Sequence, residues 1–195
     1  MSREYSRLPR THIRRSDRAV ADEEWIRAFL DRAPYGHFAI VQDGQPFINS
    51  NLFVYDAGTH AIYFHTAGTG RTPANIGDGT RVCFTTTEMG RLLPADVALE
   101  FSVEYAGVVV FGAAETVRDE QEATRALQML LDKYFPHLQP GRDYRPPVAE
   151  ELKRTAVYRL RIEEWSAKKK EVGHFPGSFY YGEQNRQQVP GEENE

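Results

Sequence analysis

The residues whose types and spacing could do chemistry lie together in the stretch YFHTAGTGRTPANI. His65 supplies an imidazole that titrates near neutral pH, and Arg71 supplies a guanidinium that can bind an oxyanion through paired hydrogen bonds. The glycines of residues 67–70 let backbone N–H groups approach a ligand closely. Thr72 followed by Pro73 is typical of an N-cap and a first helical residue, so a short helix is expected to present its N-terminus to an anion. The stretch therefore predicts a phosphate cradle, with His65 facing the rest of the bound molecule.

The same stretch also has simpler interpretations. A glycine loop between a strand and a short helix is common without any ligand, and an arginine in such a loop is usually solvated. A single imidazole is more often a core or surface residue than a catalytic one. Spacing alone leaves both the ligand-binding and the purely structural interpretation open.

Composition narrows the class of protein. The chain has 195 residues, of which 41% are hydrophobic and 12% aromatic, which suits one globular domain with a core. A formal net charge of −4 argues against a general nucleic-acid binder. Cys83 is the only cysteine, so no intrachain disulfide can form, and we expect it to be a small packed side chain. The histidines are scattered without ligand spacing, so no metal site is expected.

The ends of the sequence bear on location and partners. No apolar run approaches the roughly 20 residues that a membrane-spanning helix needs. The first 18 residues contain six arginines but no apolar segment of the kind found in secretory signals. We therefore expect a cytoplasmic protein with no membrane partner and, since one short basic arm is weak evidence, no nucleic-acid partner.

Two segments carry helical periodicity. In residues 21–36, Asp22 is placed to cap a helix, an apolar stripe follows at helical spacing, and Pro34 ends it. In residues 119–135, Asp119 with Glu122 forms a capping box of the Asp type before a second amphipathic stripe.

The other periodic segments indicate strands. Asp43 and Gly44 separate two strand-like runs, which predicts a tight hairpin. The expected strands are residues 37–41, 46–55, 61–66, 81–87, 98–117 and 155–165. Residues 98–117 are too long for a flat strand, so Gly107 and Gly112 are expected to mark bulges or a bend.

This order of elements predicts an architecture. Strands in hairpins flanked by two helices are not the alternation of a doubly wound sheet, and they close most simply into a small antiparallel barrel. We expect a basic N-terminal arm at residues 1–13, a barrel domain at residues 14–172, and a polar C-terminal tail at residues 173–195.

Several motifs in order resemble the FMN-binding split-barrel proteins related to pyridoxamine 5'-phosphate oxidase, and most closely those of the nitroimidazole-resistance type. Arg14 and Arg18 precede the first helix, and the motifs that follow are YGHFAIV, PFINSNLFVYD, AIYFHTAGTGR, VCFTTT, EYAGVVVFGAAE and LRIEEWSAKK. They span about residues 14–170. The resemblance implies a mainly β fold with flanking helices, an antiparallel six-stranded split β-barrel, and a homodimer with FMN at the subunit interface.

The resemblance also implies roles for particular residues. The flavin phosphate would meet Arg71 and Thr72, where relatives often carry a lysine after the basic residue. Backbone groups of the strands at residues 49–53 and 63–65 would serve the flavin ring. From the partner subunit, the region of Tyr105 and the segment that contains Trp165 and Lys168 would approach the flavin. The implied cofactor-binding residues are Asn51, Tyr63, Phe64, His65, Arg71, Thr72, Tyr105, Trp165 and Lys168.

The implied activity is that of a flavin-dependent reductase of 5-nitroimidazole drugs, which converts the nitro group to an amine and so gives antibiotic resistance. His65 is the candidate catalytic residue. It would donate protons, contact the nitro oxygens, or act as a nucleophile that holds a small carbonyl or carboxylate ligand.

Different functions stay open from the sequence. A pyridoxamine-phosphate oxidase would need a second phosphate site, for which Arg142 and Arg145 are the candidates. A haem- or deazaflavin-binding split barrel is a second alternative; haem would need an axial ligand, for which His65 or His174 is available. A non-catalytic flavin-binding or small-ligand-binding protein is also consistent with the sequence, with the arginine-rich arm as a contact for a partner.

Overall fold

The computed structural model describes residue 5 and residues 7–183. Its two longer helices are α2 (Glu23–Arg32) and α4 (Glu120–Tyr134), and its short helices are α3 (Arg71–Asn75), α5 (Ala149–Leu152) and the 3-10 turns η1 (Ser16–Arg18) and η2 (Ala98–Glu100). The strands are β1 (Ala19–Val20), β2 (Gly36–Gln42), β3 (Gln45–Asn51), β4 (Val54–Asp56), β5 (Ala61–Ala67), β6 (Thr80–Leu93), β7 (Ser102–Thr116), β8 (Thr155–Lys170) and β9 (Phe179–Tyr180).

Both longer helices begin at the aspartates expected to cap them. Asp22 accepts hydrogen bonds from the backbone N–H groups of Glu24 and Trp25 at 2.9 and 3.2 Å. Asp119 accepts one from Glu122 at 2.7 Å. Each cap satisfies N–H groups that have no partner within the helix, which is worth about 1 kcal/mol per cap.

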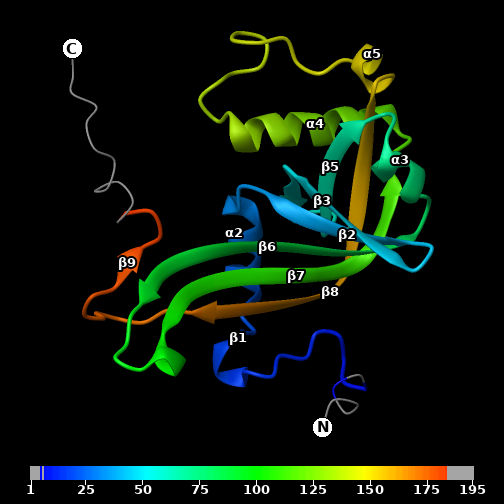
Figure 1. The fold of residues 1–195 in the computed structure, drawn as a ribbon. Coiled ribbons are helices and arrows are strands. Elements are labelled where there is room, and N and C mark those ends of the chain that lie inside the picture. The colour runs from blue at the N-terminus through cyan, green and yellow to red at the C-terminus, as the bar shows by residue number, and fades with distance from the viewer. Residues whose placement is uncertain (1–4, 6, 184–195) are drawn as a thin grey trace.

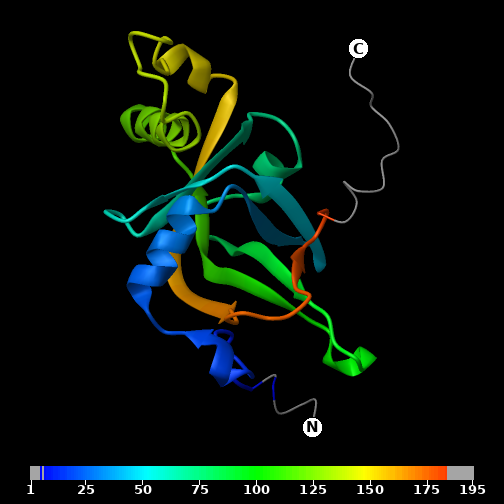
Figure 2. The same ribbon diagram turned by 90° about the vertical axis from the view of Figure 1, so that its left-hand side faces the viewer.

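The strands form one antiparallel sheet whose path is β3-β2-β6-β7-β8-β5-β4. Its two end strands, β3 and β4, are neighbours in sequence and are separated by Leu52 and Phe53 alone. The sheet must therefore curl until β3 and β4 lie close enough to be joined by these two residues. No hydrogen-bonded pairing of β3 with β4 closes the described sheet. This is an open, split barrel, and Figures 1 and 2 show the curled sheet with α2 and α4 outside it. The expected fold class is confirmed.

The break between β3 and β4 changes the expected strand count. The sequence predicts residues 46–55 as one strand of six, whereas the structure pairs β3 with β2 and β4 with β5. Tyr134 holds the break from α4, because its hydroxyl accepts from Phe53 N–H at 3.0 Å and donates to Phe53 C=O at 2.9 Å. A backbone with its polar groups bonded in this way cannot continue the ladder.

Gly112 marks the bend expected in the long strand. The register between β7 and β8 shifts between Phe111 and Gly112. A Cβ at position 112 would lie 1.9 Å from the carbonyl oxygen of Arg161, so the strands approach this closely only at a glycine. Gly107 lies in regular pairing, so the prediction of a bulge there is wrong.

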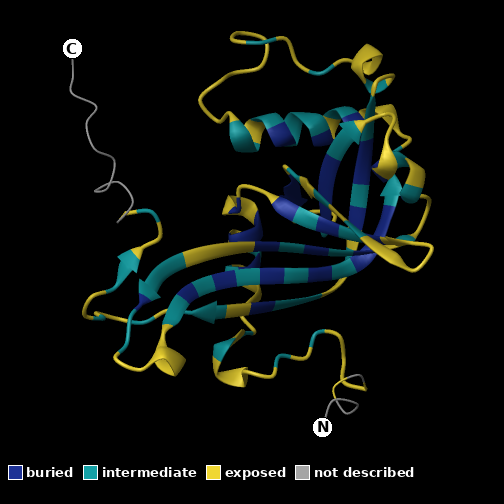
Figure 3. Ribbon diagram, in the orientation of Figure 1, coloured by how far each residue is buried: buried dark blue, intermediate teal, exposed yellow. Residues whose placement is uncertain are grey.

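Apolar residues gather on both sides of the sheet. The barrel interior contains Phe38, Phe64 and Phe84, and α2 closes it with Phe29 and Leu30. A second cluster lies between the sheet and α4, where Tyr63 and Val157 pack against Leu130. Figure 3 shows buried residues alternating along the strands, as expected for strands with one inward face.

Both ends of the described chain contact the sheet. Arg10, in the expected N-terminal arm, pairs with Glu164 at 2.6 Å and lies 5.1 Å from the ring centre of Phe111. The segment after Gly173 contains β9, which pairs with Arg91 and Leu92 of β6. The limits of arm, domain and tail remain predictions, but parts of both end segments pack on the barrel. None of the described helices is long and apolar enough to cross a membrane.

Candidate functional site

One face of β3 meets the loop that follows β5. Alternate residues of a strand share a face, so Phe47, Asn49 and Asn51 point the same way. The Arg71 guanidinium lies over the Phe47 ring, 5.1 Å from its centre. Asn49 Nδ2 donates to Thr72 Oγ1 at 3.0 Å, and Asn51 Nδ2 donates to the backbone oxygen of His65 at 3.2 Å. We call Phe47, Asn49, Asn51, Arg71 and Thr72 the β3–α3 cradle.

The expected N-cap at Thr72 is wrong. Helix α3 begins at Arg71, and its N-cap is Gly70, with φ of 132° and no side-chain cap. Glycine adopts that backbone angle readily, which lets the chain turn into the helix one residue before the threonine. Thr72 is buried inside the first turn and its hydroxyl is turned toward Asn49. A helix this short contributes little dipole, so an anion here would depend on side chains.

The polar groups of the cradle can still bind an oxyanion. Within residues 7–183 no carboxylate lies within ion-pair distance of Arg71, whereas Arg91, Arg125 and Arg159 all have carboxylate partners. The Thr72 oxygen accepts from Asn49, so its own O–H remains able to donate. An exposed guanidinium beside a free hydroxyl donor fits a phosphate group.

His65 lies in β5, which continues two residues beyond it, so the imidazole is not at the strand end as expected. Its ring faces the α4 side of the sheet, like Tyr63, and lines a pocket of about 500 Å³ with Leu127 and Leu130. Nδ1 is buried and has no hydrogen-bond partner within the described chain. Burial lowers the pKa of His65 below 6.5. The ring is therefore neutral at pH 7.

The imidazole and Arg71 do not line the same pocket. Arg71 is not among the residues around the His65 ring. What joins the two regions is the β5 backbone, because the His65 carbonyl meets Asn51 of the cradle while the His65 side chain points to α4. A ligand in contact with both would have to pass around the edge of β5.

Tyr63 and Phe64 can offer a ligand only backbone groups. Both side chains are fully buried, Phe64 against Phe38 with ring centres 3.9 Å apart, and Tyr63 with its hydroxyl donating to Glu122 at 2.7 Å. The β4–β5 ladder ends at Tyr63, whereas β5 continues to Ala67 against β8. Beyond Tyr63, one edge of β5 therefore has no strand partner within residues 7–183 and can meet a ligand.

Tyr105 and Lys168 lie together on another part of the sheet. Lys168 pairs with Gly107 across β7 and β8, and residues 105 and 107 share a face, so both side chains are on the face that points away from α2. Arg18 stacks 5.9 Å from the Tyr105 ring centre and donates to its hydroxyl at 3.2 Å. We call this side of β6, β7 and β8 the outer sheet face.

Trp165 lies on the opposite face. It pairs with Val110, whose side chain is in the barrel core. Its ring meets His60 edge-on with centres 4.7 Å apart, and Arg27 of α2 lies 5.4 Å from its centre. The structure thus separates Trp165 from Tyr105 and Lys168 within one subunit.

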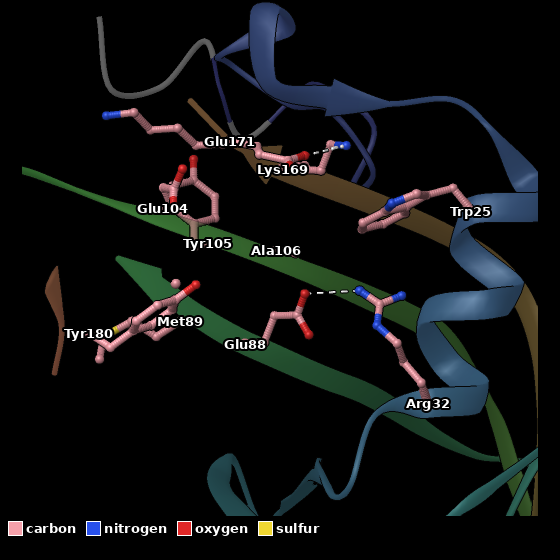
Figure 4. Close-up of a pocket in the computed structure, with 12 residues that line it drawn as sticks. Trp25, Arg32, Glu88, Met89, Glu104, Tyr105, Ala106, Lys169, Glu171 and Tyr180 are labelled. Atoms are coloured by element: carbon pink, nitrogen blue, oxygen red, sulfur yellow. Dashed lines mark hydrogen bonds and ion pairs between the residues drawn. The ribbon is translucent and has the colours of Figure 1, made fainter. Parts of the chain in front are cut away.

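Figure 4 shows a second pocket of about 500 Å³, between α2 and the ends of β6–β8, which Tyr105 also lines. Its rim is neutralised by ion pairs, Arg32–Glu88 at 2.9 Å and Lys169–Glu171 at 3.0 Å. Hydrogen bonds from Arg91 and from the backbone of Val172 lower the pKa of Glu104 to about 2, so that carboxylate stays charged. Lys170 also lines the pocket; it donates to the Ser102 hydroxyl and has no carboxylate partner within residues 7–183.

Sequence reasoning missed the cradle residues Phe47 and Asn49. The signal available was the alternation of residues 47, 49 and 51 along one strand face. What could not be known was that this face turns toward α3, because that depends on the break at Leu52 and Phe53.

A comparison with protein-family models shows the family, and solved structures share the fold. A sequence profile described as pyridoxamine 5'-phosphate oxidase matches residues 22–169. A flavocytochrome from Azotobacter vinelandii is 25% identical, with 93% of this chain and 81% of that chain covered and a TM-score of 0.72. A FAD- and haem-binding protein from Mycobacterium smegmatis is 23% identical, with 80% and 74% covered and a TM-score of 0.70.

A third solved structure is that of a protein proposed to confer 5-nitroimidazole antibiotic resistance, from Bacteroides thetaiotaomicron. It is 18% identical, with 78% of this chain and 90% of that chain covered and a TM-score of 0.60. At this identity the likeness shows the fold alone. A search of curated proteins finds no match to the chain.

Proposed function

The chain belongs to the pyridoxamine 5'-phosphate oxidase family of split-barrel proteins, and on that premise we propose that it is a flavin-dependent oxidoreductase that binds FMN at a homodimer interface. The observation that carries the proposal is the β3–α3 cradle. There an arginine without a carboxylate partner in residues 7–183 and a threonine hydroxyl with a free hydrogen lie beside an open strand edge.

Each part of the cradle has a role in this proposal. Arg71 and the Thr72 hydroxyl bind the FMN phosphate. Asn51 fixes the His65 carbonyl, and the open backbone edge of β5 after Tyr63 provides hydrogen-bonding groups for the polar edge of the flavin ring. The bound flavin supplies the electron and hydride chemistry, and the protein positions the substrate and controls protons.

The outer sheet face supports a homodimer. Tyr105, Val109 and Lys168 lie on it and are not fully buried within one subunit. A partner packed here would place Tyr105 and Lys168 near the neighbouring cradle, with Lys168 available to a phosphate or to the flavin edge. Trp165 is on the core face, so its contribution is to close the barrel end beside His60.

His65 is the proposed proton donor. Burial favours the neutral ring, so the form that donates is the imidazolium that arises when the ring takes up a proton from solvent. An imidazole with this titration range can pass protons to a reduced product and be reprotonated from solvent. In the finer form of the proposal the substrate is a 5-nitroimidazole and the product its amine, made in the cytoplasm.

The test is FMN binding and turnover by the purified protein with a chemical reductant. His65→Ala is expected to keep FMN bound and to lower turnover of a nitroimidazole at least about tenfold, since general acid catalysis typically contributes a hundredfold or more. If FMN binding is lost in this variant instead, His65 is a cofactor-binding residue and not the proton donor.

A second candidate function is that of a flavin- and haem-binding protein. The specific observation is the buried His65 nitrogen, without a partner in the described chain, in a pocket with leucine walls, because a neutral imidazole is a common axial haem ligand. The flavocytochrome similarity supports it. A Soret band in the purified protein that disappears in His65→Ala would establish this function in place of the proton-donor role.

The pyridoxamine-phosphate oxidase activity and a partner-binding role of the arginine-rich arm both lose support. Arg142 and Arg145, the candidates for a second phosphate site, are paired with Asp143 and Glu151 at 2.8 and 2.6 Å. Among the arginines of residues 7–18, Arg10, Arg15 and Arg18 have carboxylate partners, whereas Arg7 and Arg14 have none within the described residues. These paired arginines are not free to bind a substrate phosphate or a nucleic acid.

A further inference from the structure

The pocket at His65 has one apolar side. Leu127, Leu130 and Leu131 project from α4 at helical spacing, and Pro147 lines it from the loop before α5. Such a wall suits the hydrocarbon part of a small molecule, because burying apolar surface contributes roughly 25 cal/mol per Å².

The opposite side of the pocket is polar and comes from β5 and the start of β8. His65, Arg154 and Thr155 line it. The backbone of Arg154 is held at both ends, since its N–H donates to Glu151 C=O at 3.1 Å and its C=O accepts from Gly68 N–H at 2.9 Å. The backbone that carries Arg154 is therefore fixed at this side of the pocket.

The charges of this pocket are not balanced. Glu151 is the acidic group that lines it, and its carboxylate already accepts from Arg145 at 2.6 Å and from Val148 N–H at 3.1 Å. No carboxylate of residues 7–183 pairs with the Arg154 guanidinium, unlike Arg142 and Arg145 in the preceding loop. Arg154 therefore brings to this pocket a positive charge that has no carboxylate partner within residues 7–183.

From this combination we propose that the pocket binds a small organic carboxylate with an apolar body. The carboxylate meets Arg154 and the Thr155 hydroxyl, the His65 ring contacts it from β5, and the apolar body lies on the α4 leucines. A neutral nitroimidazole would leave Arg154 without a partner. The inference rests on the proposed function only in regarding this ligand as the substrate, because the binding itself requires no flavin.

The test uses three probes of equal shape, which are phenylpropionate, phenylpropanol and phenylpropylamine. Each is titrated into the purified full-length protein and followed by calorimetry and by NMR shifts of the α4 residues. We expect phenylpropionate to bind roughly ten- to a hundredfold more tightly than the alcohol, which is the range for a charge-assisted hydrogen bond. The amine should bind most weakly, because its positive charge is repelled by that of Arg154.

Substitutions test whether Arg154 causes the preference for the carboxylate probe. Arg154→Gln should reduce phenylpropionate affinity to that of the alcohol, and Arg154→Lys should restore part of it. Arg142→Gln is the matched control, since that exposed arginine pairs with Asp143 and lies outside the pocket. Leu127→Ala should weaken all three probes by a similar factor.

Equal binding of phenylpropionate and phenylpropanol, or selectivity that survives in Arg154→Gln, would overturn the inference. So would a Soret band that depends on His65, because haem would then occupy the pocket. Loss of FMN binding with carboxylate selectivity intact would reject the proposed function and leave this site standing.

Discussion

At the scale of single residues, Arg71 carries most of the case for a phosphate site. It has an aromatic ring beneath it and no carboxylate partner in the described chain, and the residue that follows it, Thr72, is uncharged. The cradle therefore depends on one guanidinium more than it would with a neighbouring lysine.

We predict that Arg71→Gln weakens FMN binding by roughly ten- to a hundredfold, the equivalent of about 1.5–3 kcal/mol for a hydrogen bond to a charged group. Fluorescence titration with FMN measures the change. Arg118→Gln is the control, because Arg118 is an exposed arginine paired with Asp78 at 2.8 Å and lies outside the cradle. Equal affinity for FMN in Arg71→Gln and in the control would show that the FMN phosphate does not bind at Arg71.

His65 gives a prediction about pH. Burial lowers the pKa of His65, so between pH 6.5 and its folded-state pKa the unfolded chain binds a proton that the folded protein does not. The stabilising difference is complete above pH 6.5 and is lost as the pH falls below it. His65→Gln should thus lose less stability than the wild type between pH 7.5 and 5.5, as measured by urea unfolding.

Burial and the neighbouring Arg27 also lower the pKa of His60, so some sensitivity must persist in His65→Gln. Identical pH dependence in the wild type and His65→Gln would show that the imidazole is solvated when the protein is folded.

At the scale of elements, α4 holds the break between β3 and β4. The Tyr134 hydroxyl bonds both backbone groups of Phe53, and Lys133 donates to the Leu30 carbonyl at 3.2 Å and lies 4.0 Å from the Phe53 ring centre. The C-terminus of α4 thereby ties α2 to the junction that orients Asn49 and Asn51.

We predict that Tyr134→Phe lowers the free energy of unfolding by about 1–3 kcal/mol, because it leaves the buried N–H and C=O of Phe53 without partners. Urea unfolding measures the loss. Tyr181→Phe, at a side chain that is 72% exposed, should change stability little. A Tyr134→Phe variant as stable as this control would mean that water replaces the hydroxyl at the junction.

Element types could be predicted from the sequence where the signal is local. The Asp22 and Asp119 caps are confirmed, and so is the hairpin at Asp43 and Gly44, both of which have positive φ angles. Features set by distant contacts could not be predicted. The break at Phe53 requires the Tyr134 hydroxyl, and β9 is a strand only because β6 provides an edge for it.

The candidate site divides in the same way. The resemblance implies that Arg71, Thr72 and Asn51 serve one cofactor, and in the structure Asn49 bonds Thr72 while Asn51, on the same face of β3, bonds the His65 carbonyl. The direction of the His65 ring depends on which face of β5 is turned toward α4, and a local pattern does not show this. The prediction of a Thr72 cap is wrong because the turn at Gly70 starts the helix earlier. Trp165 and Lys168 are close in sequence, but odd spacing on a strand puts them on opposite faces.

At the scale of the whole molecule, the outer sheet face is the surface proposed for dimerisation. We predict a dimer by analytical ultracentrifugation at micromolar concentration. Val109→Lys should shift it toward monomer, because a charge would be buried on the face beside Tyr105. Leu138→Lys, in the exposed loop after α4, should leave the mass unchanged. A monomeric wild type would place the entire flavin site within one subunit.

The measurement that tests the central claim most directly is the absorption spectrum of the freshly purified protein, before and after adding FMN, with mass spectrometry of what denaturation releases. We predict flavin bands, released FMN, no Soret band, and weaker reconstitution in Arg71→Gln. A protein that is colourless as purified and leaves the spectrum of added FMN unchanged would contradict this claim.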